Sequence, residues 1–376
     1  MILVTETPLA GQAAVVMERA MRIAGLDLAQ VEKLSLVERG IGQREKFREV
    51  FYETIEEPIY TKTGKLSKRT KKIRRPSSEM VECTHRCLEK LGRHAGGELI
   101  LSSGNETLRE LSGLDGIADY RGSVLHGRQP PEWPHGNPIQ KLVAIADPGW
   151  IARGQFVDFW ILASDLAKAK RESAFPEIRR EEWVQWTEPT LEQIAECAQE
   201  IVNTQSWWTL DVETRAGTLA CFALGWRDSN GKLKSICVPV QTARGPFWTP
   251  TQELALWKMM REMASRNRFL VNQNLEYDIY YMLRYGMEPS GVWMDTMLVQ
   301  SILHPEFPKG LDFLCSYWLD DVVYYKGEGR NWKAGDRDQQ LWEYNCKDAV
   351  YTLRVAEKLD AELKKRGWWE RYHGKT

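Results

Sequence analysis

Long hydrophobic runs are missing from this chain of 376 residues. No run reaches the roughly 18 apolar residues that a membrane-spanning helix needs, so we expect no membrane as a partner. The seven cysteines are unevenly spaced, and the chain opens without the basic and apolar segments of a secretion signal. These absences predict a protein of the cytoplasm, or of the host-cell cytoplasm if the protein is viral.

An excess of charge of one sign is also missing. The 51 basic and 52 acidic residues nearly cancel, so any surface for nucleic acid must be local. Residues 61–75 are the exception, with eight basic residues and no acid. We expect a loop or hairpin tip without acidic neighbours that contacts phosphates, although such runs are otherwise typical of solvated loops. The predicted DNA-binding residues are Lys65, Lys68, Arg69, Lys71, Lys72, Arg74 and Arg75.

The length predicts about two domains, and the 43% of apolar residues is enough for real cores. In residues 1–172 expected strands (2–4, 98–102 and 142–146) alternate with helices, which predicts an α/β domain with a mainly parallel sheet. Residues 173–182 are charged and contain a proline, so we expect a linker there. In residues 183–376 we expect three antiparallel strands, then a helix, a strand and helices to the end.

Four acidic residues in the second domain form the clearest functional pattern. Asp211 and Glu213 lie two residues apart on an expected strand, so their carboxylates share one face. Asp278 opens an apolar helical stretch, while Tyr344 and Asp348 share a helix face. Alone, each motif is typical of a solvated strand edge or helix surface. Together, four carboxylates can hold two hard divalent cations for in-line attack on a phosphodiester.

The order and spacing of these motifs resemble the DEDD superfamily of 3′-5′ exonucleases, in the subclass whose third motif carries Tyr instead of His. Two further segments, Met294–Leu298 and Lys309–Leu314, look like helical segments of the proofreading domains of family-A DNA polymerases. The resemblance covers residues 183–365 and implies a ribonuclease-H-like fold with a mixed sheet.

The resemblance also implies a role for each residue of the site. Asp211 would bridge two Mg²⁺ or Mn²⁺ ions, and Glu213 and Asp348 would complete the site of the ion that activates water. Asp278 would act on the second ion, and Tyr344 would orient the attacking water. The implied substrate-binding residues are Thr214, Asn274 and Tyr277.

The expected function is therefore a two-metal-ion exonuclease that acts on single-stranded or frayed 3′ ends of DNA and releases nucleoside 5′-monophosphates. Proofreading or replication is the expected context, with a separate DNA polymerase subunit as a candidate partner. Such polymerases continue into further domains, whereas this chain ends at Thr376. Three alternatives therefore remain: a free-standing enzyme, one half of a split polymerase, or a fragment. Two alternatives are an RNA-trimming exonuclease and a non-enzymatic DNA-binding replication scaffold.

The first domain resembles the uracil-DNA glycosylase superfamily, which implies a parallel-sheet α/β/α fold. The matching segments occur along the chain in the same order as in the family. The matching segments are Val4–Leu9, Arg75–Pro76, Leu99–Asn105, Tyr120–Gly122 and Ala146–Arg153.

Two departures from this family stand out. Asp147 takes the place of a histidine that stabilises the developing uracil anion, and a carboxylate there would oppose that charge. The iron–sulfur cluster of the relatives needs four thiolates, but this domain has only Cys83 and Cys87, so we expect no cluster. We therefore expect a non-catalytic domain that binds DNA, with a shell that serves only for packing as the alternative.

Overall fold

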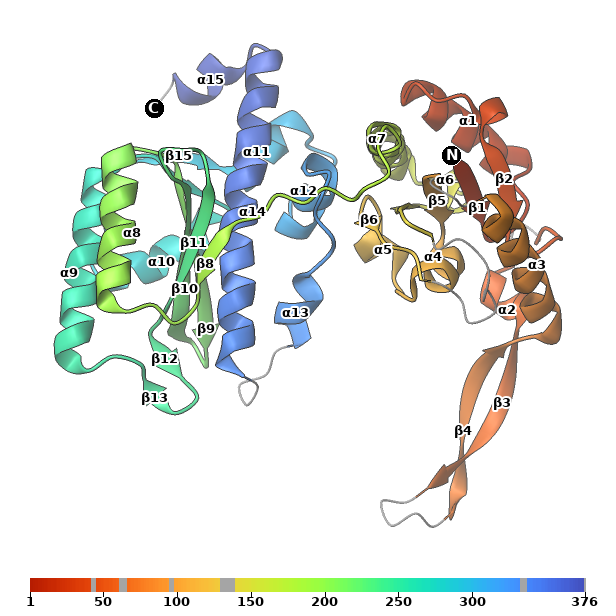
Figure 1. Ribbon diagram of the computed structural model, residues 1–376, viewed down its shortest axis with the longest axis horizontal. Helices are drawn as coiled ribbons and strands as arrows, with labels where there is room; N and C mark the ends of the chain where they lie inside the picture. Colours follow the sequence, from red (N-terminus) through yellow and green to blue (C-terminus); the bar gives the residue numbers. More distant parts are fainter. Residues whose placement is uncertain (42–44, 61–65, 95–97, 129–138, 332–336, 375–376) are drawn as a thin grey trace. The chain divides into compact units, whose positions relative to one another are not determined.

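The computed structural model describes residues 1–41, 45–60, 66–94, 98–128, 139–331 and 337–374. The chain forms two compact units, Met1–Arg179 and Arg180–Thr376. Both units combine helices with sheets that contain parallel strands, so the predicted α/β class is confirmed (Figure 1). None of the helices within the described ranges is both long and apolar enough to cross a membrane.

The sheet of the first unit has the strand order β2-β1-β5-β7-β6. Strands β1 (Ile2–Thr5), β2 (Glu32–Ser35), β5 (Ile100–Ser103) and β7 (Leu142–Ile145) are parallel, and β6 (Val124–Leu125) runs antiparallel to β7. Every residue of β1, β5 and β7 is buried, as expected of parallel strands covered on both faces. These three strands were expected from the sequence, whereas β2 is half exposed and β6 has two residues, too weak a pattern to predict.

Helices α1, α6 and α7 pack on one face of this sheet. Their apolar side chains, such as Met17 and Leu166, meet Leu3, Leu101 and Val143, which lie side by side on three adjacent strands. The helical segments of this unit are α1 (Gly11–Ile23), η1 (Leu28–Gln30), α2 (Phe47–Phe51), α3 (Ser78–His94), α4 (Asn105–Ser112), α5 (Ile117–Tyr120), α6 (Pro148–Ala152) and α7 (Phe156–Glu172).

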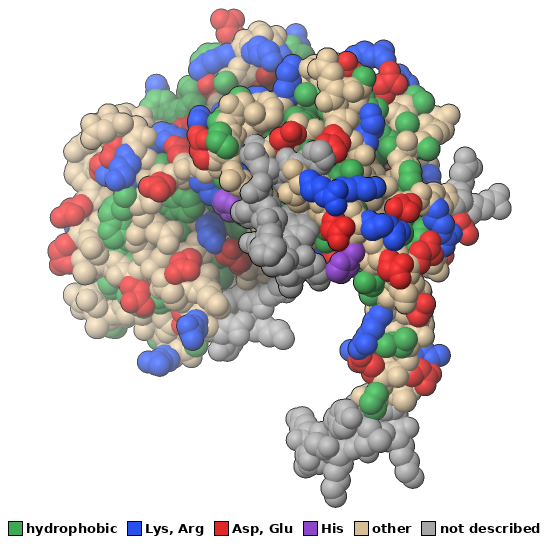
Figure 2. Space-filling view, turned by 45° about the vertical axis from the view of Figure 1, so that its right-hand side comes forward, with side chains coloured by type: hydrophobic (Ala, Val, Ile, Leu, Met, Phe, Trp, Pro, Cys, Tyr) green, Lys and Arg blue, Asp and Glu red, His purple; other side chains and the backbone are tan. Residues whose placement is uncertain are grey.

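Most of the basic stretch forms one strand of a hairpin, whereas a loop or hairpin tip was expected. Strand β4 (Leu66–Pro76) pairs antiparallel with β3 (Tyr52–Tyr60) in a separate hairpin. The expectation of no acidic neighbours is also wrong, because Glu56 faces Lys72 and Glu57 faces Lys71 across the hairpin. Basic and acidic side chains accordingly lie next to one another on the hairpin (Figure 2). Opposite charges on facing positions stabilise a strand pair that has little apolar surface to bury.

The sheet of the second unit is mixed, with the order β15-β14-β9-β10-β11-β8. Its centre is an antiparallel meander of three strands, extended by β14 parallel to β9, β15 parallel to β14, and β8 parallel to β11. The strands are β8 (Val184–Trp186), β9 (Trp208–Arg215), β10 (Thr218–Arg227), β11 (Leu233–Pro239), β14 (Leu270–Asn272) and β15 (Val292–Asp295), beside the small pair β12 (Gln241–Thr242) and β13 (Gly245–Pro246).

Strand β15 corrects the expectation of helices alone after β14. Residues 292–295 form a strand, and helix α11 (Thr296–Leu303) begins immediately after it. The carboxylate of Asp295 accepts hydrogen bonds from the backbone N–H groups of Met297 and Leu298, so it caps α11 at the point where the strand ends. A strand of four residues is too short to show a clear alternation of apolar and polar residues, so the sequence does not distinguish it from the apolar helix that follows.

Two layers of helix enclose the second sheet (Figure 1). Helices α8 (Leu191–Thr204) and α9 (Pro250–Arg266) lie on one face, and the long helix α14 (Asp338–Lys365) lies on the other. Capping boxes at Thr190 and Thr249 begin the first two helices. The remaining helices are α10 (Leu275–Arg284), α12 (Leu311–Trp318), α13 (Lys326–Asn331) and α15 (Trp369–His373).

Helix α14 approaches the sheet closely at Gly225 of β10. The hydroxyl of Thr209 donates a hydrogen bond of 2.8 Å to the backbone oxygen of Ala349 in α14. A Cβ atom on Gly225 would lie 2.7 Å from that hydroxyl and 2.9 Å from that backbone oxygen. Glycine is therefore required here for steric reasons, because any side chain would push the helix away from the sheet.

We expect Gly225→Ala to destabilise the protein by about 1–3 kcal/mol, since an added methyl in a packed interface forces backbone movement. Urea denaturation followed by circular dichroism measures the change. Ser229→Ala in the exposed turn after β10 is the matched control and should stay within about 0.5 kcal/mol. Equal stability of the two variants would contradict the close approach.

Candidate active site of the second unit

Three of the predicted acids meet between the central strand and the long helix. Asp211 and Glu213 project from β9, and Asp348 from α14. One carboxylate oxygen of each lies within 4.8 Å of the others. Asn345, one turn before Asp348, donates hydrogen bonds to the carboxylate of Asp211 (2.6 Å) and to its backbone oxygen (3.1 Å). The amide therefore holds the strand acid in register with the helix acid.

The fourth acid, Asp278, is buried in α10 next to this group of three. One of its oxygens accepts a hydrogen bond from the backbone N–H of Val212 (2.9 Å), and the other accepts one from Asn272 (2.7 Å). Val212 stands between the two acids of β9, so this contact fixes α10 against the strand. Asp278 thus lies beside the cluster of three and not within it.

Both oxygens of Asp348 are engaged by two consecutive side chains at the start of α13. The hydroxyl of Tyr325 donates to one oxygen and the ammonium of Lys326 to the other, each at 2.5 Å. Lys326 also donates to the hydroxyl of Tyr344 at 2.9 Å. Tyr344 and Asp348 are therefore brought together through a lysine that the sequence analysis missed.

Burial, with mutual repulsion of the acids as a second cause, raises the pKa values of three of the four acids. Burial, followed by repulsion from Asp348, raises the pKa of Glu213 to about 7. Burial also raises the pKa of Asp278 to about 7 and that of Asp211 well above its usual value. Lys326 acts in the opposite direction on Asp211 and Glu213. Burial and crowding make the ionised carboxylates unfavourable, and a bound cation would relieve this. Since all the ligand atoms are oxygens, the site fits hard divalent cations.

Two of the predicted substrate-binding residues meet at the edge of the cluster. The hydroxyls of Thr214, which follows Glu213 in β9, and Tyr277 of α10 lie 3.2 Å apart. Tyr277 is 45% exposed, so part of this residue is accessible to a ligand. Asn274 takes a left-handed backbone conformation before α10, and its N–H donates to Asp295. Asn274 is exposed, and no hydrogen bond among the described residues joins it to the other two.

Four residues that support the site were not predicted from the sequence. They are Asn272, Tyr325, Lys326 and Asn345. Asn272 ends a strand and Asn345 follows Tyr344 directly, so their places next to recognised motifs were available as a signal. Tyr325 and Lys326 offered none, because they reach Asp348 from a separate segment of the chain.

In the first unit, Asp147, the acid expected to oppose the charge of a uracil anion, forms hydrogen bonds with the backbone. Asp147 follows β7, and its carboxylate accepts hydrogen bonds from the backbone N–H groups of Gly149 (2.9 Å) and Trp150 (3.2 Å). It therefore caps α6. The tight turn into that helix gives a reason for an aspartate here that does not involve a substrate.

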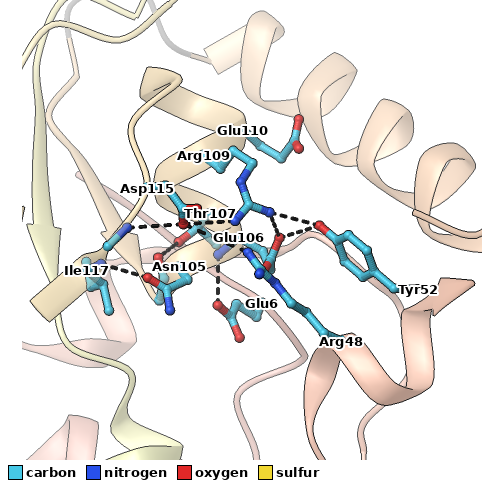
Figure 3. Close-up of polar contacts among 12 residues, drawn as sticks. Glu6, Arg48, Tyr52, Asn105, Glu106, Thr107, Arg109, Glu110, Asp115 and Ile117 are labelled. Carbon is cyan, nitrogen blue, oxygen red and sulfur yellow. Dashed lines mark hydrogen bonds and ion pairs between the residues drawn. The ribbon is translucent and has the colours of Figure 1, made fainter. Parts of the chain in front are cut away.

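Two further acids lie at the same end of the first sheet. Glu6 follows β1 and accepts a hydrogen bond from the backbone N–H of Glu106 at 2.9 Å, and burial raises its pKa to about 7. The carboxylate of Glu106 is held by Arg48, Arg109 and the hydroxyl of Tyr52 (Figure 3). These contacts tie α4 to the base of the hairpin.

The predicted DNA-binding residues of β4 differ in whether they are paired with an acid. Lys71, Lys72 and Arg74 are exposed, and Arg75 is exposed but paired with Glu57. Lys68 and Arg69 also belong to β4, although their side chains are outside the description. Lys65 lies outside the described residues. The basic surface of the hairpin is thus partly neutralised by its own acidic strand.

Comparison with known proteins supports an exonuclease domain in the second unit. The family described as 3′-5′ exonuclease matches residues 236–364, which include Asp278, Tyr344 and Asp348. Asp211 and Glu213 precede the matched range. No curated protein matches the chain. The family match supports nuclease activity as the general function of this unit.

Solved structures with a likeness to the chain have low similarity scores. A protein from Bifidobacterium adolescentis has a TM-score of 0.37 at 16% identity over 50% of this chain and 46% of its own length. The POL domain of Pol1 from M. smegmatis, in complex with DNA primer-template and dNTP, has a TM-score of 0.35 at 16% identity over 50% of this chain and 28% of its own. Brucella melitensis NrnC has a TM-score of 0.34 at 16% identity over 50% and 84%. The chain thus spans less than half of the first two.

The raised pKa of Glu213 predicts how stability depends on pH. A carboxyl whose pKa rises from 4.5 to about 7 on folding disfavours the fold once it ionises, so ion-free protein should lose stability as pH rises through that interval. Glu213→Gln should flatten this loss, by on the order of 1–3 kcal/mol above pH 7. Thermal unfolding between pH 4.5 and 8 in EDTA is the measurement. The exposed Glu276→Gln serves as control, and identical pH profiles for both variants would disprove the prediction.

Proposed function

We propose that the second unit is a two-metal-ion exonuclease that shortens DNA from the 3′ end and releases nucleoside 5′-monophosphates. The observation that carries this proposal is the cluster of Asp211, Glu213 and Asp348, with ligand oxygens within 4.8 Å of one another, beside a match to the 3′-5′ exonuclease family. If the acids served only to stabilise the fold, each would be expected to form an ion pair with its own basic side chain. Here one ammonium, that of Lys326, donates to Asp348, and its charge acts to lower the pKa values of Asp211 and Glu213.

The side chains around the cluster have different roles in the proposed reaction. Divalent ions, when bound, lower the pKa of water and stabilise the charge that develops on the phosphate. Asp211, Glu213 and Asp348 hold the ions, with Asp278 next to them. The hydroxyl of Tyr344 orients the attacking water.

The terminal nucleotide binds at the edge of the acid cluster, next to Tyr277 and Thr214. The half-exposed ring of Tyr277 offers a stacking surface for a base, because every base has a π face. Thr214 holds the tyrosine hydroxyl and can contact the sugar. A stacking surface of this type accepts a splayed single strand more readily than a paired end, so we assign single-stranded or frayed 3′ ends as substrate.

The choice of DNA over RNA belongs to the proposal and has a direct test. The same acids would cleave either polymer, and a ribose hydroxyl differs from deoxyribose by one donor and acceptor. Paired DNA and RNA oligonucleotides of identical sequence, labelled at the 5′ end, should show faster shortening of DNA. Faster shortening of RNA would assign the protein to RNA trimming instead.

For the first unit we propose a glycosylase-like fold that holds DNA without excising uracil. The capping contacts of Asp147 support the loss of uracil chemistry, since the residue is engaged by two backbone N–H groups. The exposed basic residues of β4 support DNA holding. A role in replication or proofreading beside a separate polymerase, in the cytoplasm, completes the proposal.

We expect Asp211→Ala and Asp348→Ala to abolish shortening of 5′-labelled DNA in the presence of Mg²⁺ or Mn²⁺, because each removes a ligand of the ion site. Tyr344→Phe should reduce the rate by a smaller factor, on the order of 10²-fold, since it affects the water and not the ions. A one-nucleotide ladder on a denaturing gel is the readout.

The exposed Glu306→Ala, outside the cluster, is the control for loss of an acid and should retain the ladder. Circular dichroism verifies that each variant folds. Full activity of Asp211→Ala, or of the unaltered protein in EDTA, would disprove the two-ion assignment.

The hairpin allows a test with opposite changes on facing strands. Lys71→Ala with Lys72→Ala should weaken binding of single-stranded DNA and flatten its salt dependence by about 0.7 in log-log slope per lost phosphate contact. Glu56→Gln with Glu57→Gln removes the facing acids and should strengthen binding. Fluorescence anisotropy between 50 and about 200 mM salt measures both. Unchanged slopes in the two variants would identify the hairpin as a solvated surface.

A further inference from the structure

Lys326 is a cation placed inside a cluster of acids, and the four-acid pattern assigns it no role. Its side chain is 17% exposed, and its ammonium lies 2.5 Å from Asp348 and 2.9 Å from the hydroxyl of Tyr344. It also lies 5.1 Å from the centre of the Tyr344 ring. A buried lysine loses hydration, so these contacts must compensate for it.

The packing of α13 fixes this lysine in place. A Cβ atom on Gly329 would lie 2.5 Å from the Tyr344 ring, so only glycine lets α13 approach so closely. The buried ring of Tyr325 packs 5.9 Å from that of Tyr344. At the outer side, Lys347 of α14 pairs with Glu328 of α13 at 2.6 Å. The position of Lys326 thus follows from several contacts of its segment and not from one rotamer.

The hydrogen bond to Tyr344 decides which way that hydroxyl can donate. An ammonium has donors alone, so the tyrosine oxygen must accept from Lys326. The hydroxyl proton then points to an acceptor other than Lys326, and the carboxylate of Asp348 is one such partner in the structure. A hydroxyl held in this way can donate toward a water or a phosphate oxygen at the acid cluster, which is the orientation that the proposed reaction requires of Tyr344.

The contact with Asp348 places Lys326 in competition with any bound cation. Tyr325 and Lys326 together engage both oxygens of this carboxylate. Each oxygen keeps a second lone pair, but an ion that takes Asp348 as a ligand must approach the positive charge of Lys326, which lies 2.5 Å from the same carboxylate. In the absence of ions, the lysine supplies positive charge where three carboxylates converge.

We propose that Lys326 is a positioning residue of the exonuclease site, which orients the Tyr344 hydroxyl and occupies Asp348 until a divalent cation displaces it from that carboxylate. This inference rests on the proposed function. It deepens that function by assigning a second, non-acidic group to the control of both ion binding and water orientation.

Calorimetric titration with Mn²⁺ at pH 8, without DNA, tests the ion competition. Lys326→Met removes the competing charge and should tighten Mn²⁺ binding by about tenfold, the size expected when one charge-assisted hydrogen bond no longer has to be displaced. Lys326→Arg keeps the charge and should bind Mn²⁺ within about twofold of the unaltered protein. If Lys326→Met fails to fold, Lys326→Gln gives the same reading.

Steady-state digestion of DNA tests the orientation of Tyr344. Lys326→Met should lower kcat by roughly 10- to 100-fold with little change in KM, because the hydroxyl keeps its place but loses its direction. In combination with Tyr344→Phe, the lysine change should add little further loss, since both act through one hydroxyl. Additive losses would overturn the orientation role.

Lys347→Met is the matched control, because this lysine also joins α13 to α14 but pairs with Glu328. It should leave Mn²⁺ affinity and kcat within about twofold. Unchanged Mn²⁺ affinity and kcat in Lys326→Met, beside an active unaltered protein, would overturn the inference alone. No binding of Mn²⁺ by the unaltered protein would overturn the proposed function and this inference with it.

Discussion

The mutual repulsion of buried carboxylates is the constraint on which the second unit depends. Asp211, Glu213 and Asp348 lie close enough to share an ion, and their surroundings raise the pKa values of the two strand acids. Such an arrangement is unfavourable until cations enter, so the scaffold must hold it against a force that would separate the strand from the helix. The contacts that do so are short and specific.

Three kinds of contact oppose this repulsion. Asn345 joins α14 to Asp211 of the strand, and the backbone N–H of Val212 joins the strand to Asp278 of α10. Gly225 allows α14 to lie directly on the sheet. Lys326 adds a positive charge from a third segment. The helices on the far face, with their capping boxes, provide a rigid support for β9, because precise placement of reacting groups needs regular elements beneath them.

The first unit shows the opposite use of acidic residues. Its acids are engaged by backbone N–H groups and by arginines, as in the contacts of Asp147 and of Glu106 with Arg48. Each therefore has a structural reason to be present. The same division applies to the hairpin, in which an acidic strand faces a basic one and leaves a reduced positive surface. Acids of the second unit also have partners, such as Asn345 and Lys326, but three of them converge within 4.8 Å, whereas these acids of the first unit join neighbouring elements of the fold.

The sequence by itself determined the elements whose patterns are local. The alternation of strands and helices, the antiparallel meander with Asp211 and Glu213 on one strand, and the helical position of Asp348 could be predicted because side-chain periodicity follows from backbone geometry. Only the tertiary structure decided that β4 is a strand facing glutamates, that β15 precedes α11, and that Lys326 reaches Asp348. Each of these depends on residues far apart in the chain, and no local period records which distant charge will lie opposite another.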